Sequence, residues 1–352
     1  MNKFLTEIFE QPKSFGAVLS YYCSAEGEAK LNEIRELFRK EHLQQIIFTG
    51  MGSSYFASYA ASCLFNNLGI HSYAVNTSEL LYHNFSLVTK ETLVVCISQS
   101  GESVEIVKLL KKLPRDVFFV GVSNEEKSSL SAAKGIRALL MTKAGREEMT
   151  SSKTYTSTAL VLFILGWFLS DKWGGAKAAQ VKDLIVDTER LLANHEKLVD
   201  DEFRLFGDVE FMQFIGRGPL FSSALQSELM FKEASKVPAA AAMGAEFRHG
   251  PMEMVKPGFK SILFAAEGNT YDQSIRMATD IAKNQGKVTL ITNKDPHLSD
   301  HNIRTISINQ TDEFLFAIES IIPIQLMVNH VALAKGYVPG DFILGGKITL
   351  KE

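Results

Sequence analysis

Short apolar runs alternate along the chain with longer stretches in which apolar side chains recur at helical spacing. The runs, 46–48 and 93–97 among them, have the length and the Val, Ile and Leu content of buried strands. Ser103 to Lys112 and Tyr271 to Asn284 carry helical periodicity. Strands that alternate with helices are typical of a parallel sheet covered on both faces. The pattern therefore predicts an α/β fold.

The same series of elements occurs twice. The first copy opens with an apolar run that enters Gly50-Met51-Gly52, and the second opens with one that enters Gly216-Arg217-Gly218. The five corresponding pairs, at offsets of about 166 to 171, are 46–52 with 212–218, 78–83 with 245–249, 93–97 with 262–265, 117–124 with 288–293, and 136–137 with 303–304. The sequence thus predicts two tandem doubly wound parallel-sheet domains related by an internal repeat.

The repeat sets the expected domain boundaries. They are an N-terminal helical segment over 1–39, a first domain over 40–175, a linker helix over 176–208, a second domain over 209–335 and a C-terminal tail over 336–352. Ala176 to Phe206 is polar and free of proline, which favours one long amphipathic helix between the copies. The tail has lost helical periodicity.

The composition is that of a folded globular chain. Of the 352 residues, 46% are hydrophobic and 22% are charged, and 24 Gly with 9 Pro leave no room for a long low-complexity segment. The 37 basic and 40 acidic residues give a formal net charge of -3. This balance offers no basic stripe to a phosphate backbone, so nucleic acid is not an expected partner.

Cysteine usage and hydropathy indicate a cytoplasmic location. Cys23, Cys63 and Cys96 are odd in number and widely spaced, which favours neither a disulfide framework nor a zinc site. Residues 1–15 include acidic and polar side chains where a signal peptide has an apolar core. The longest apolar run, Ala159 to Leu169, has eleven residues, short of the roughly 20 that cross a bilayer. We expect this run to be a buried helix and expect no membrane partner.

Small hydroxyl side chains come directly after two strands of the first copy. The run 46–49 leads into Gly50 to Ser54, and the run 93–97 leads into Ser98 to Ser103 and then a helix. Ligands of open parallel sheets bind at the carboxyl ends of the strands, where free N–H groups and helix N-termini favour an anion. The two loops together predict a phosphate monoester site. Either loop alone is equally a capped helix start, since Ser is a preferred N-cap residue.

A nucleotide fits these loops less well. Gly50-x-Gly52 lacks the third glycine of the dinucleotide fingerprint, because Tyr55 holds that place. Gly346-Lys347-Ile348 matches a phosphate-binding P-loop in neither spacing nor final hydroxyl.

The second copy supplies titratable side chains. On a helix predicted over Phe221 to Ser235, Leu225 and Leu229 define an apolar stripe, and Glu233 lies four residues further along it. This spacing aims a carboxylate inward. Two interpretations stay open: a buried partner of an Arg, or an acid/base group whose pKa is raised by burial.

His249 is the one of eight histidines that is predicted to lie on a stiff loop. It stands just before Pro251, which fits the first turn of a short helix over Met252 to Val255. A structural and a catalytic role both remain open for it. The other histidines have no constellation around them.

Taken together, these motifs resemble a known family. Ser98-Gln-Ser-Gly-Glu-Ser103, the paired Gly-x-Gly strands and Glu246-Phe-Arg-His-Gly-Pro251 are similar to those of double sugar isomerase (SIS) proteins, most clearly the isomerase half of glucosamine-6-phosphate synthase. The resemblance runs from Glu7 to Pro12, through Thr150 to Lys153, to the tail around Lys347. It implies flavodoxin-like SIS domains, a phosphosugar ligand and a tail that contributes to the active site.

The resemblance also implies a role for each matching residue. The residues that match those holding the sugar phosphate are Ser54, Ser98, Gln99, Ser100 and Ser103, and Ser151 matches a hydroxyl that contacts the sugar. Glu233 matches the carboxylate that moves a proton between C1 and C2, a task that needs one base within reach of both carbons. His249, from the neighbouring subunit, would assist ring opening. Lys347, where the tail is shifted by one residue, would form a Schiff base with the open-chain ketose.

Two departures from the synthase shape the expected activity. The chain enters the SIS region directly after Met1, without a glutamine amidotransferase domain, so we do not expect glutamine-dependent synthesis. Met230 stands where the synthase has a lysine, three residues before Glu233. Relatives that remove nitrogen retain the Glu and the His. We therefore expect a phosphosugar isomerase/deaminase that acts on an amino-substituted hexose 6-phosphate, such as glucosamine 6-phosphate, and releases ammonia or an amine.

Two alternatives stay open. A deglycase of fructosamine (Amadori) 6-phosphates would use Glu233 and His249 as acid and base and leave Lys347 idle. A non-catalytic phosphosugar sensor would bind the ligand without chemistry. We expect a homodimer, because a composite site would take His249 from across the interface. We expect no metal, since no His, Asp or Cys cluster has ligand spacing, and no other cofactor.

Overall fold

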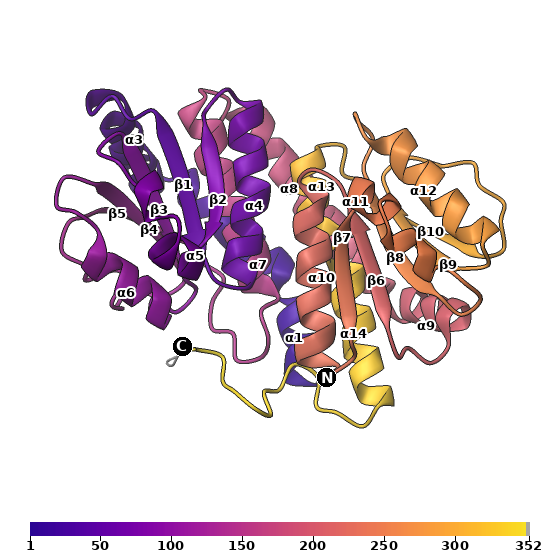
Figure 1. Cartoon of the computed structure of the whole chain (residues 1–352). Coiled ribbons are helices and arrows are strands. Elements are labelled where there is room, and N and C mark those ends of the chain that lie inside the picture. The colour runs from indigo at the N-terminus through magenta and orange to yellow at the C-terminus, as the bar shows by residue number, and fades with distance from the viewer. Residues whose placement is uncertain (350–352) are drawn as a thin grey trace. The chain divides into compact units, whose positions relative to one another are not determined.

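The chain forms two units, each built around a five-stranded parallel sheet (Figure 1). A computed structural model describes residues 1–349, apart from the side chains of Glu202 and Phe203. The first-copy unit comprises residues 10–182 with the tail segment 343–349, and the second-copy unit comprises residues 1–9 with 183–342. The first nine residues therefore group with the second copy and the tail with the first, whereas the sequence-based division treats both as separate segments.

The two sheets have the same strand order. The first contains β1 (Gln45–Gly50), β2 (Ser72–Asn76), β3 (Thr92–Ile97), β4 (Phe118–Ser123) and β5 (Ile136–Met141), in the order β2-β1-β3-β4-β5. The second contains β6 (Met212–Gly216), β7 (Ala239–Met243), β8 (Lys260–Ala265), β9 (Lys287–Thr292) and β10 (Ile303–Ser307), in the order β7-β6-β8-β9-β10. All pairings are parallel. This is the flavodoxin-like order of doubly wound sheets, so the predicted tandem α/β fold is confirmed.

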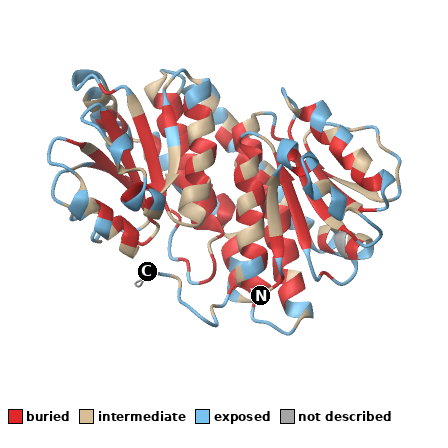
Figure 2. Cartoon of the chain, viewed as in Figure 1, coloured by how far each residue is buried: buried red, intermediate tan, exposed pale blue. Residues whose placement is uncertain are grey.

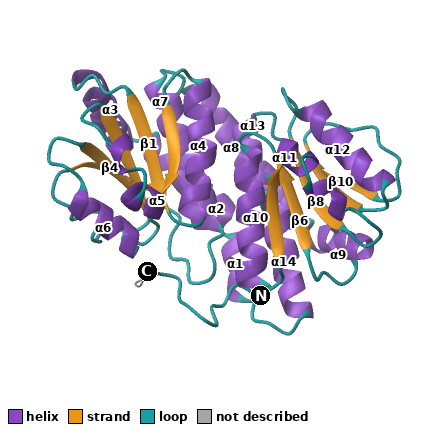
Figure 3. Cartoon of the chain, in the orientation of Figure 1, coloured by secondary structure: helices purple, strands orange, loops and turns teal. Residues whose placement is uncertain are grey.

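Helices cover both faces of the first sheet (Figure 3). They are α2 (Gln11–Tyr22), α3 (Ala25–Lys40), α4 (Ser53–Asn67), α5 (Thr77–Tyr82), α6 (Val104–Lys112) and α7 (Lys153–Leu169), with a 3-10 turn over Phe85–Leu87. On one face, Ile47 and Val94 of the strands pack with Leu80 of α5 and Ile106 of α6. On the other, α4 packs on β1 and β2, and the rings of Phe48 and Phe65 meet edge to face with their centroids 4.8 Å apart. Alternate strand residues thus supply two cores.

The second sheet is covered in the same way. Its helices are α1 (Lys3–Phe9), α9 (His195–Phe206), α10 (Leu220–Ala234), α11 (Gly244–Arg248), α12 (Tyr271–Lys283), α13 (Glu313–Glu319) and α14 (Ile322–Ala334), with a 3-10 turn over Pro251–Met254; α8 (Gly175–Ala193) runs from the first-copy unit into the second. Helices α11 and α12 pack over Ile215 and Leu263 on one face. Helix α10 packs on β6 and β7 on the other. Most strand residues of both sheets are buried (Figure 2).

Three parts of the sequence-based description need correction. The expected single helix over Ala176 to Phe206 is two helices, α8 and α9, which separate at Asn194. Strands β2 and β7 were not predicted from the apolar pattern. Strand β2 carries polar and half-exposed positions at the edge of its sheet, and β7 is an alanine run, which has little intrinsic β propensity.

The apolar helices lie inside the units. The run Ala159 to Leu169 falls in α7, whose residues Lys153 to Phe168 are all buried, as predicted. The stretch Glu313–Ala334, which holds α13 and α14, is long and apolar enough to span a membrane by composition. Its most apolar window is 89% buried inside the structure, as a core helix would be.

Candidate functional site: a hydroxyl loop, a tail lysine and a buried carboxylate

Strands β1 and β3 are neighbours, so the loops at their carboxyl ends lie at one edge of the first sheet. Gly50 ends β1 beside the end of β3: a Cβ added there would lie 2.7 Å from Cβ of Ser54 and 3.0 Å from the carbonyl oxygen of Ile97. Only glycine therefore lets the first turn of α4 approach β3 this closely. Ser54 is brought to the carboxyl end of β3, next to the Ser98–Ser103 loop.

The Ser98–Ser103 loop is folded on its own hydroxyl groups. The Ser98 Oγ accepts a hydrogen bond from the Gly101 backbone N–H at 3.0 Å and lies 3.1 Å from the Ser103 Oγ. The Ser100 Oγ accepts from the Glu102 N–H at 3.2 Å. Ser98 is 1% and Ser100 9% exposed. These contacts turn the chain tightly between β3 and α6.

Gly101 has a positive φ of +68°, a conformation that other residues rarely adopt. An added Cβ would also lie 2.2 Å from the Ser128 Oγ. Beside it, Glu102 accepts hydrogen bonds from Ser129 through both carboxylate oxygens, at 2.6 Å and 2.7 Å. These bonds hold the pKa of Glu102 below its usual range. The loop is therefore fixed at its outer side as well.

Several donors of this loop remain available for an anion. Within the part of the chain that the structure describes, the N–H groups of Gln99, Ser100 and Ser103 donate to no protein atom. The Gln99 side chain and Ser103 are half-buried. Helices α4 and α6 both begin at this edge, so their N-terminal partial charges add to the N–H groups. The predicted phosphate residues Ser54, Ser98, Gln99, Ser100 and Ser103 are thus brought together at one sheet edge.

Lys347 of the tail is bound to a buried carboxylate. Its Nζ donates to Glu147 Oε2 and to the Met149 carbonyl oxygen, both at 2.7 Å. The Glu147 side chain is 0% exposed and the Lys347 side chain 20% exposed. Such a buried ion pair requires further hydrogen bonds to offset its desolvation.

Glu147 receives those further bonds from the start of α7. Its Oε1 accepts from the backbone N–H groups of Ser152, at 2.9 Å, and Thr154, at 3.1 Å, and from the Ser152 hydroxyl at 3.2 Å. Its Oε2 accepts from the Thr154 hydroxyl at 2.5 Å. That hydroxyl in turn lies 2.8 Å from the Oγ of Ser151, the predicted sugar-binding residue. Ser151 and Lys347 are thus joined through Thr154 and Glu147.

The tail also reaches the start of α6. The Val104 N–H donates to the Thr349 carbonyl oxygen at 3.2 Å. Thr349 is two residues after Lys347, and consecutive Cα atoms are about 3.8 Å apart. The Cα atom of Lys347 is therefore at most two such steps from that of Thr349, which is bonded to the first turn of α6. The Ser98–Ser103 loop, called the hydroxyl loop below, lies with Ser151 and Lys347 at one edge of the first-copy unit.

Glu233 lies near the end of α10 in the second-copy unit, and the stripe that it continues is not the fully buried face of this helix. Leu225, Leu229 and Glu233 are all half-buried. The buried face of α10 instead carries Ser223, whose Oγ donates to the Ala317 carbonyl oxygen at 3.0 Å, and Phe231, whose ring meets Phe214 of β6. The stripe was set by periodicity, whereas the packing partners α13 and β6 determine which face is buried.

His249 stands at the end of α11, in the loop that precedes the Pro251–Met254 turn. The predicted proline-started turn is therefore present. The side chain of His249 is exposed in the chain. Glu233 and His249 thus belong to the second-copy unit, and the other predicted site residues belong to the first-copy unit.

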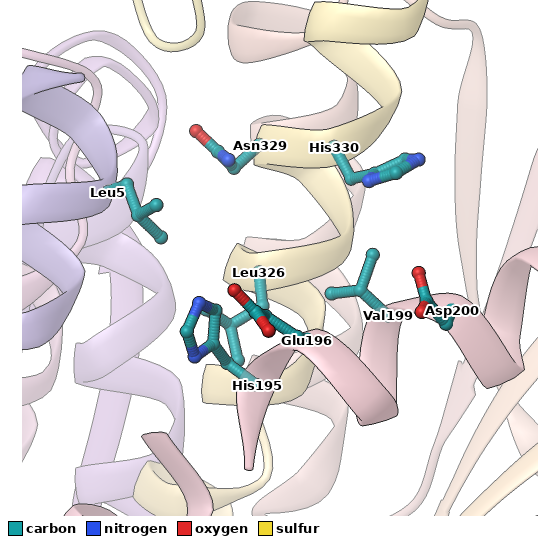
Figure 4. A pocket seen from close by; sticks show the side chains of 8 residues that line it. All are labelled: Leu5, His195, Glu196, Val199, Asp200, Leu326, Asn329 and His330. Carbon is teal, nitrogen blue, oxygen red and sulfur yellow. The ribbon is translucent and has the colours of Figure 1, made fainter. Parts of the chain in front are cut away.

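A pocket of about 290 Å³ in the second-copy unit is lined by side chains of α1, α9 and α14 (Figure 4), and two of its polar side chains, His195 and Asn329, bind other groups of the chain. Nδ1 of His195 donates to the Leu192 carbonyl oxygen at 2.9 Å, and its ring packs edge to face on Phe9. Asn329 accepts a hydrogen bond from Asn2 at 2.8 Å. We assign no function to this pocket. Among the described residues, no three His, Cys, Asp or Glu side chains are grouped to hold a metal ion.

Comparison with known proteins places the chain in a family. The model of the SIS domain matches residues 16–166 and 208–335. The chain therefore belongs to the SIS-domain family and contains two copies of the domain.

Individual relatives within this family resemble the chain over nearly its whole length. The chain is 29% identical over 342 residues to glutamine--fructose-6-phosphate aminotransferase [isomerizing] of Pyrococcus horikoshii, covering 95% of this chain and 55% of the relative. It spans about half the length of such curated relatives. The C-terminal domain of glucosamine-fructose-6-phosphate aminotransferase from Francisella tularensis aligns with a TM-score of 0.84 at 25% identity, covering 96% of this chain and 97% of that chain. A glucosamine-6-phosphate deaminase from Thermotoga maritima has the same fold, with a TM-score of 0.76 at 20% identity over 99% of both chains.

Glu147 is the site residue that the sequence analysis missed. It stands in the polar segment Arg146-Glu147-Glu148, where its residue type does not distinguish it from Glu148. Glu148 pairs with Arg146 at the surface, at 3.2 Å. The one available signal was the spacing of Glu147 just ahead of a Ser- and Thr-rich helix start, where a carboxylate can bind free N–H groups.

Proposed function

We propose that this chain is a phosphosugar isomerase that acts on an amino-substituted hexose 6-phosphate and releases ammonia or an amine during aldose–ketose proton transfer. The observation that carries the proposal is the edge of the first sheet, where free N–H groups and serine hydroxyls lie within reach of a lysine-bearing tail. A phosphate held by the loop would fix one end of the sugar and leave C1 and C2 to the side chains around it.

Each candidate site residue has a proposed role that suits the chemistry of its side chain. In this proposal the residues of the hydroxyl loop and Ser54 bind the phosphate, and Ser151 contacts the sugar. Glu233 carries the proton between C1 and C2, which one carboxylate within reach of both carbons can do. His249 assists ring opening, and Lys347 activates the open-chain carbonyl. The similarity to aminotransferases that act on fructose 6-phosphate and to a glucosamine-6-phosphate deaminase supports an amino sugar phosphate as the substrate.

The test is a coupled assay for ammonia and for fructose 6-phosphate with glucosamine 6-phosphate as substrate. We expect both products from the unaltered chain and a loss of at least about 100-fold in Glu233→Gln, the size typical of removing a general base. Glu228→Gln, five residues earlier on α10 in an ion pair with Lys232, is the matched control and should retain activity. If the unaltered chain and Glu228→Gln are both folded and neither releases ammonia from glucosamine 6-phosphate, the deaminase is rejected.

The engaged amine of Lys347 favours a second candidate, the deglycase of fructosamine 6-phosphates. An amine held by Glu147 and the Met149 carbonyl oxygen can serve to fix the tail without touching the substrate. Under that function Lys347→Met would lower turnover of a fructosamine 6-phosphate only several-fold. Under the deaminase function it would abolish turnover of glucosamine 6-phosphate.

We also propose that the active form is a homodimer. His249 is exposed in the chain, as expected for a side chain supplied to a neighbouring subunit. Size-exclusion chromatography with activity measured across the peak should place the activity in a dimer. A fully active monomer would contradict this assembly.

A further inference from the structure

Glu147 makes more contacts than the capping of α7 requires. Its Oε1 alone receives the Ser152 N–H, the Thr154 N–H and the Ser152 hydroxyl, which satisfy the start of the helix. Its Oε2 is left to the Thr154 hydroxyl and to Lys347. One oxygen is therefore structural, and the other faces the amine of a mostly covered lysine that keeps 20% of its side chain exposed.

From this geometry we propose that Glu147 is the acid–base partner of Lys347 and holds its amine at the candidate sugar site. The inference rests on the proposed function, in which Lys347 attacks the open-chain ketose. It adds a carboxylate to which neither the sequence motifs nor the comparisons assign a role.

The reaction step balances with these two groups alone. The Lys347 ammonium gives a proton to Glu147 Oε2, and the neutral amine attacks C2, so that the Nζ–C2 bond forms and the C2–O π bond breaks. A second Nζ proton moves to the former carbonyl oxygen, which becomes a hydroxyl. Glu147 then protonates that hydroxyl, which leaves as water, and the nitrogen lone pair forms the iminium. Glu147 ends as the carboxylate, and the two protons lost from the amine are in the water.

The surroundings of the pair suit this exchange. The Glu147 side chain has no exposed surface, so bulk water does not reach the proton that Lys347 would transfer to it. The hydrogen-bonded series from Lys347 through Glu147 and Thr154 reaches Ser151, which is half-buried. The carboxylate that would receive the lysine proton therefore also orients the hydroxyl expected to contact the sugar.

The test traps the iminium. The chain is incubated with fructose 6-phosphate and sodium borohydride, and the mass gained on the tail peptide that contains Lys347 is measured. We expect adduct in the unaltered chain, none in Lys347→Met, and at least a 100-fold slower rate in Glu147→Gln. Glu148→Gln, the neighbouring surface carboxylate, is the matched control and should react at the unaltered rate.

A binding measurement separates this role from a merely structural one. Glucitol 6-phosphate, which has no carbonyl group, should bind Glu147→Gln within about threefold of the unaltered affinity. If Glu147→Gln does not fold, Glu147→Asp replaces it: the carboxylate is kept but set back by one methylene, and trapping should fall at least tenfold with binding retained.

The outcomes distinguish the inference from the proposed function. Trapping at an unaltered rate in Glu147→Gln, or in Glu147→Asp when that variant is used, overturns the role of Glu147. Release of ammonia without any adduct on Lys347 overturns it too and leaves the deaminase in place. Adduct without ammonia from glucosamine 6-phosphate rejects the deaminase, and the variants still decide the role of Glu147.

Discussion

The two copies share a strand order but differ in the loops at the carboxyl ends of their strands. After β3 the first copy has Ser98 to Ser103, a loop held by its own hydroxyl groups. After β8 the second copy has Ala266 to Thr270, with Glu267 paired to Lys294 at the surface, at 2.8 Å. A sheet edge with the same topology thus presents free N–H groups in one copy and a surface ion pair in the other. Topology places a potential site, and the loop residues decide its chemistry.

Buried carboxylates extend the comparison. Glu147 of the first-copy unit receives five hydrogen bonds or ion-pair contacts. Glu319 of the second-copy unit is 1% exposed, and its Oε2 has no hydrogen-bond partner among the described residues. Burial, with the nearby charge of Asp187, raises the pKa of Glu319 to about 8. Donor groups therefore surround the buried acid of the first copy, whereas burial favours the neutral form of the buried acid in the second copy.

The largest difference between the two copies is expected when one methyl group is added to a glycine of each loop. Gly101→Ala would place Cβ 2.2 Å from the Ser128 Oγ at a positive φ, whereas Gly268, at φ +151°, has no atom within 4 Å of the added Cβ. We expect Gly101→Ala to lower turnover by at least about 100-fold, because the clash distorts the phosphate loop.

Gly268→Ala should leave turnover within about twofold, although its unusual φ costs roughly 1 to 2 kcal/mol of stability. Steady-state kinetics and urea unfolding of both variants measure this difference. Equal loss of turnover in the two variants would show that the copies contribute alike.

Glu319 makes the stability of the second-copy unit depend on pH. Its folded pKa of about 8 lies above the unfolded value of 4.5, so the folded state binds the proton more tightly. Stability is therefore greatest below about pH 4.5 as far as this group is concerned, and falls as the pH rises to about 8. The expected loss between about pH 6 and pH 9 is on the order of 3 kcal/mol.

Glu319→Gln keeps the shape and removes the titration. Urea unfolding at several pH values should show a flatter pH dependence in the variant, which should also be more stable than the unaltered chain at pH 9. An unchanged slope would mean that Glu319 does not titrate in this range.

Lys236 offers a smaller test within the second-copy unit. Its Nζ donates to the Glu233 carbonyl oxygen and to the Asp341 carbonyl oxygen, the latter at 2.6 Å, which ties the end of α10 to the first part of the tail. Lys236→Met should cost about 1 to 3 kcal/mol of stability, since the carbonyl oxygens lose a charged donor. Turnover should fall less than tenfold, because Lys236 does not touch the hydroxyl loop. A loss as large as that of Gly101→Ala would assign Lys236 to the site itself.

The fold and the hydroxyl loop could be predicted from the sequence because both depend on local patterns. Apolar runs mark β1, β3, β6 and β8, and serine clusters after β1 and β3 mark a sheet edge. The partner of Lys347 was beyond such reasoning, since Glu147 lies 200 positions away and the contact depends on where the tail folds. The stripe of Leu225, Leu229 and Glu233 is only half-buried for a related reason: periodicity finds a stripe, but the packed neighbours decide whether it faces the core.

The central claim is that the hydroxyl loop of the first copy binds the phosphate. Calorimetric titration with glucitol 6-phosphate tests it in two variants at matching helix starts: Ser98→Ala with Ser103→Ala at α6, and Thr270→Ala at α12. Loss of two hydroxyl hydrogen bonds to a charged group should raise Kd by roughly 30-fold or more in the double variant, while Thr270→Ala should leave Kd within about twofold. An unchanged Kd in the double variant, or a loss of binding in Thr270→Ala, would contradict the account.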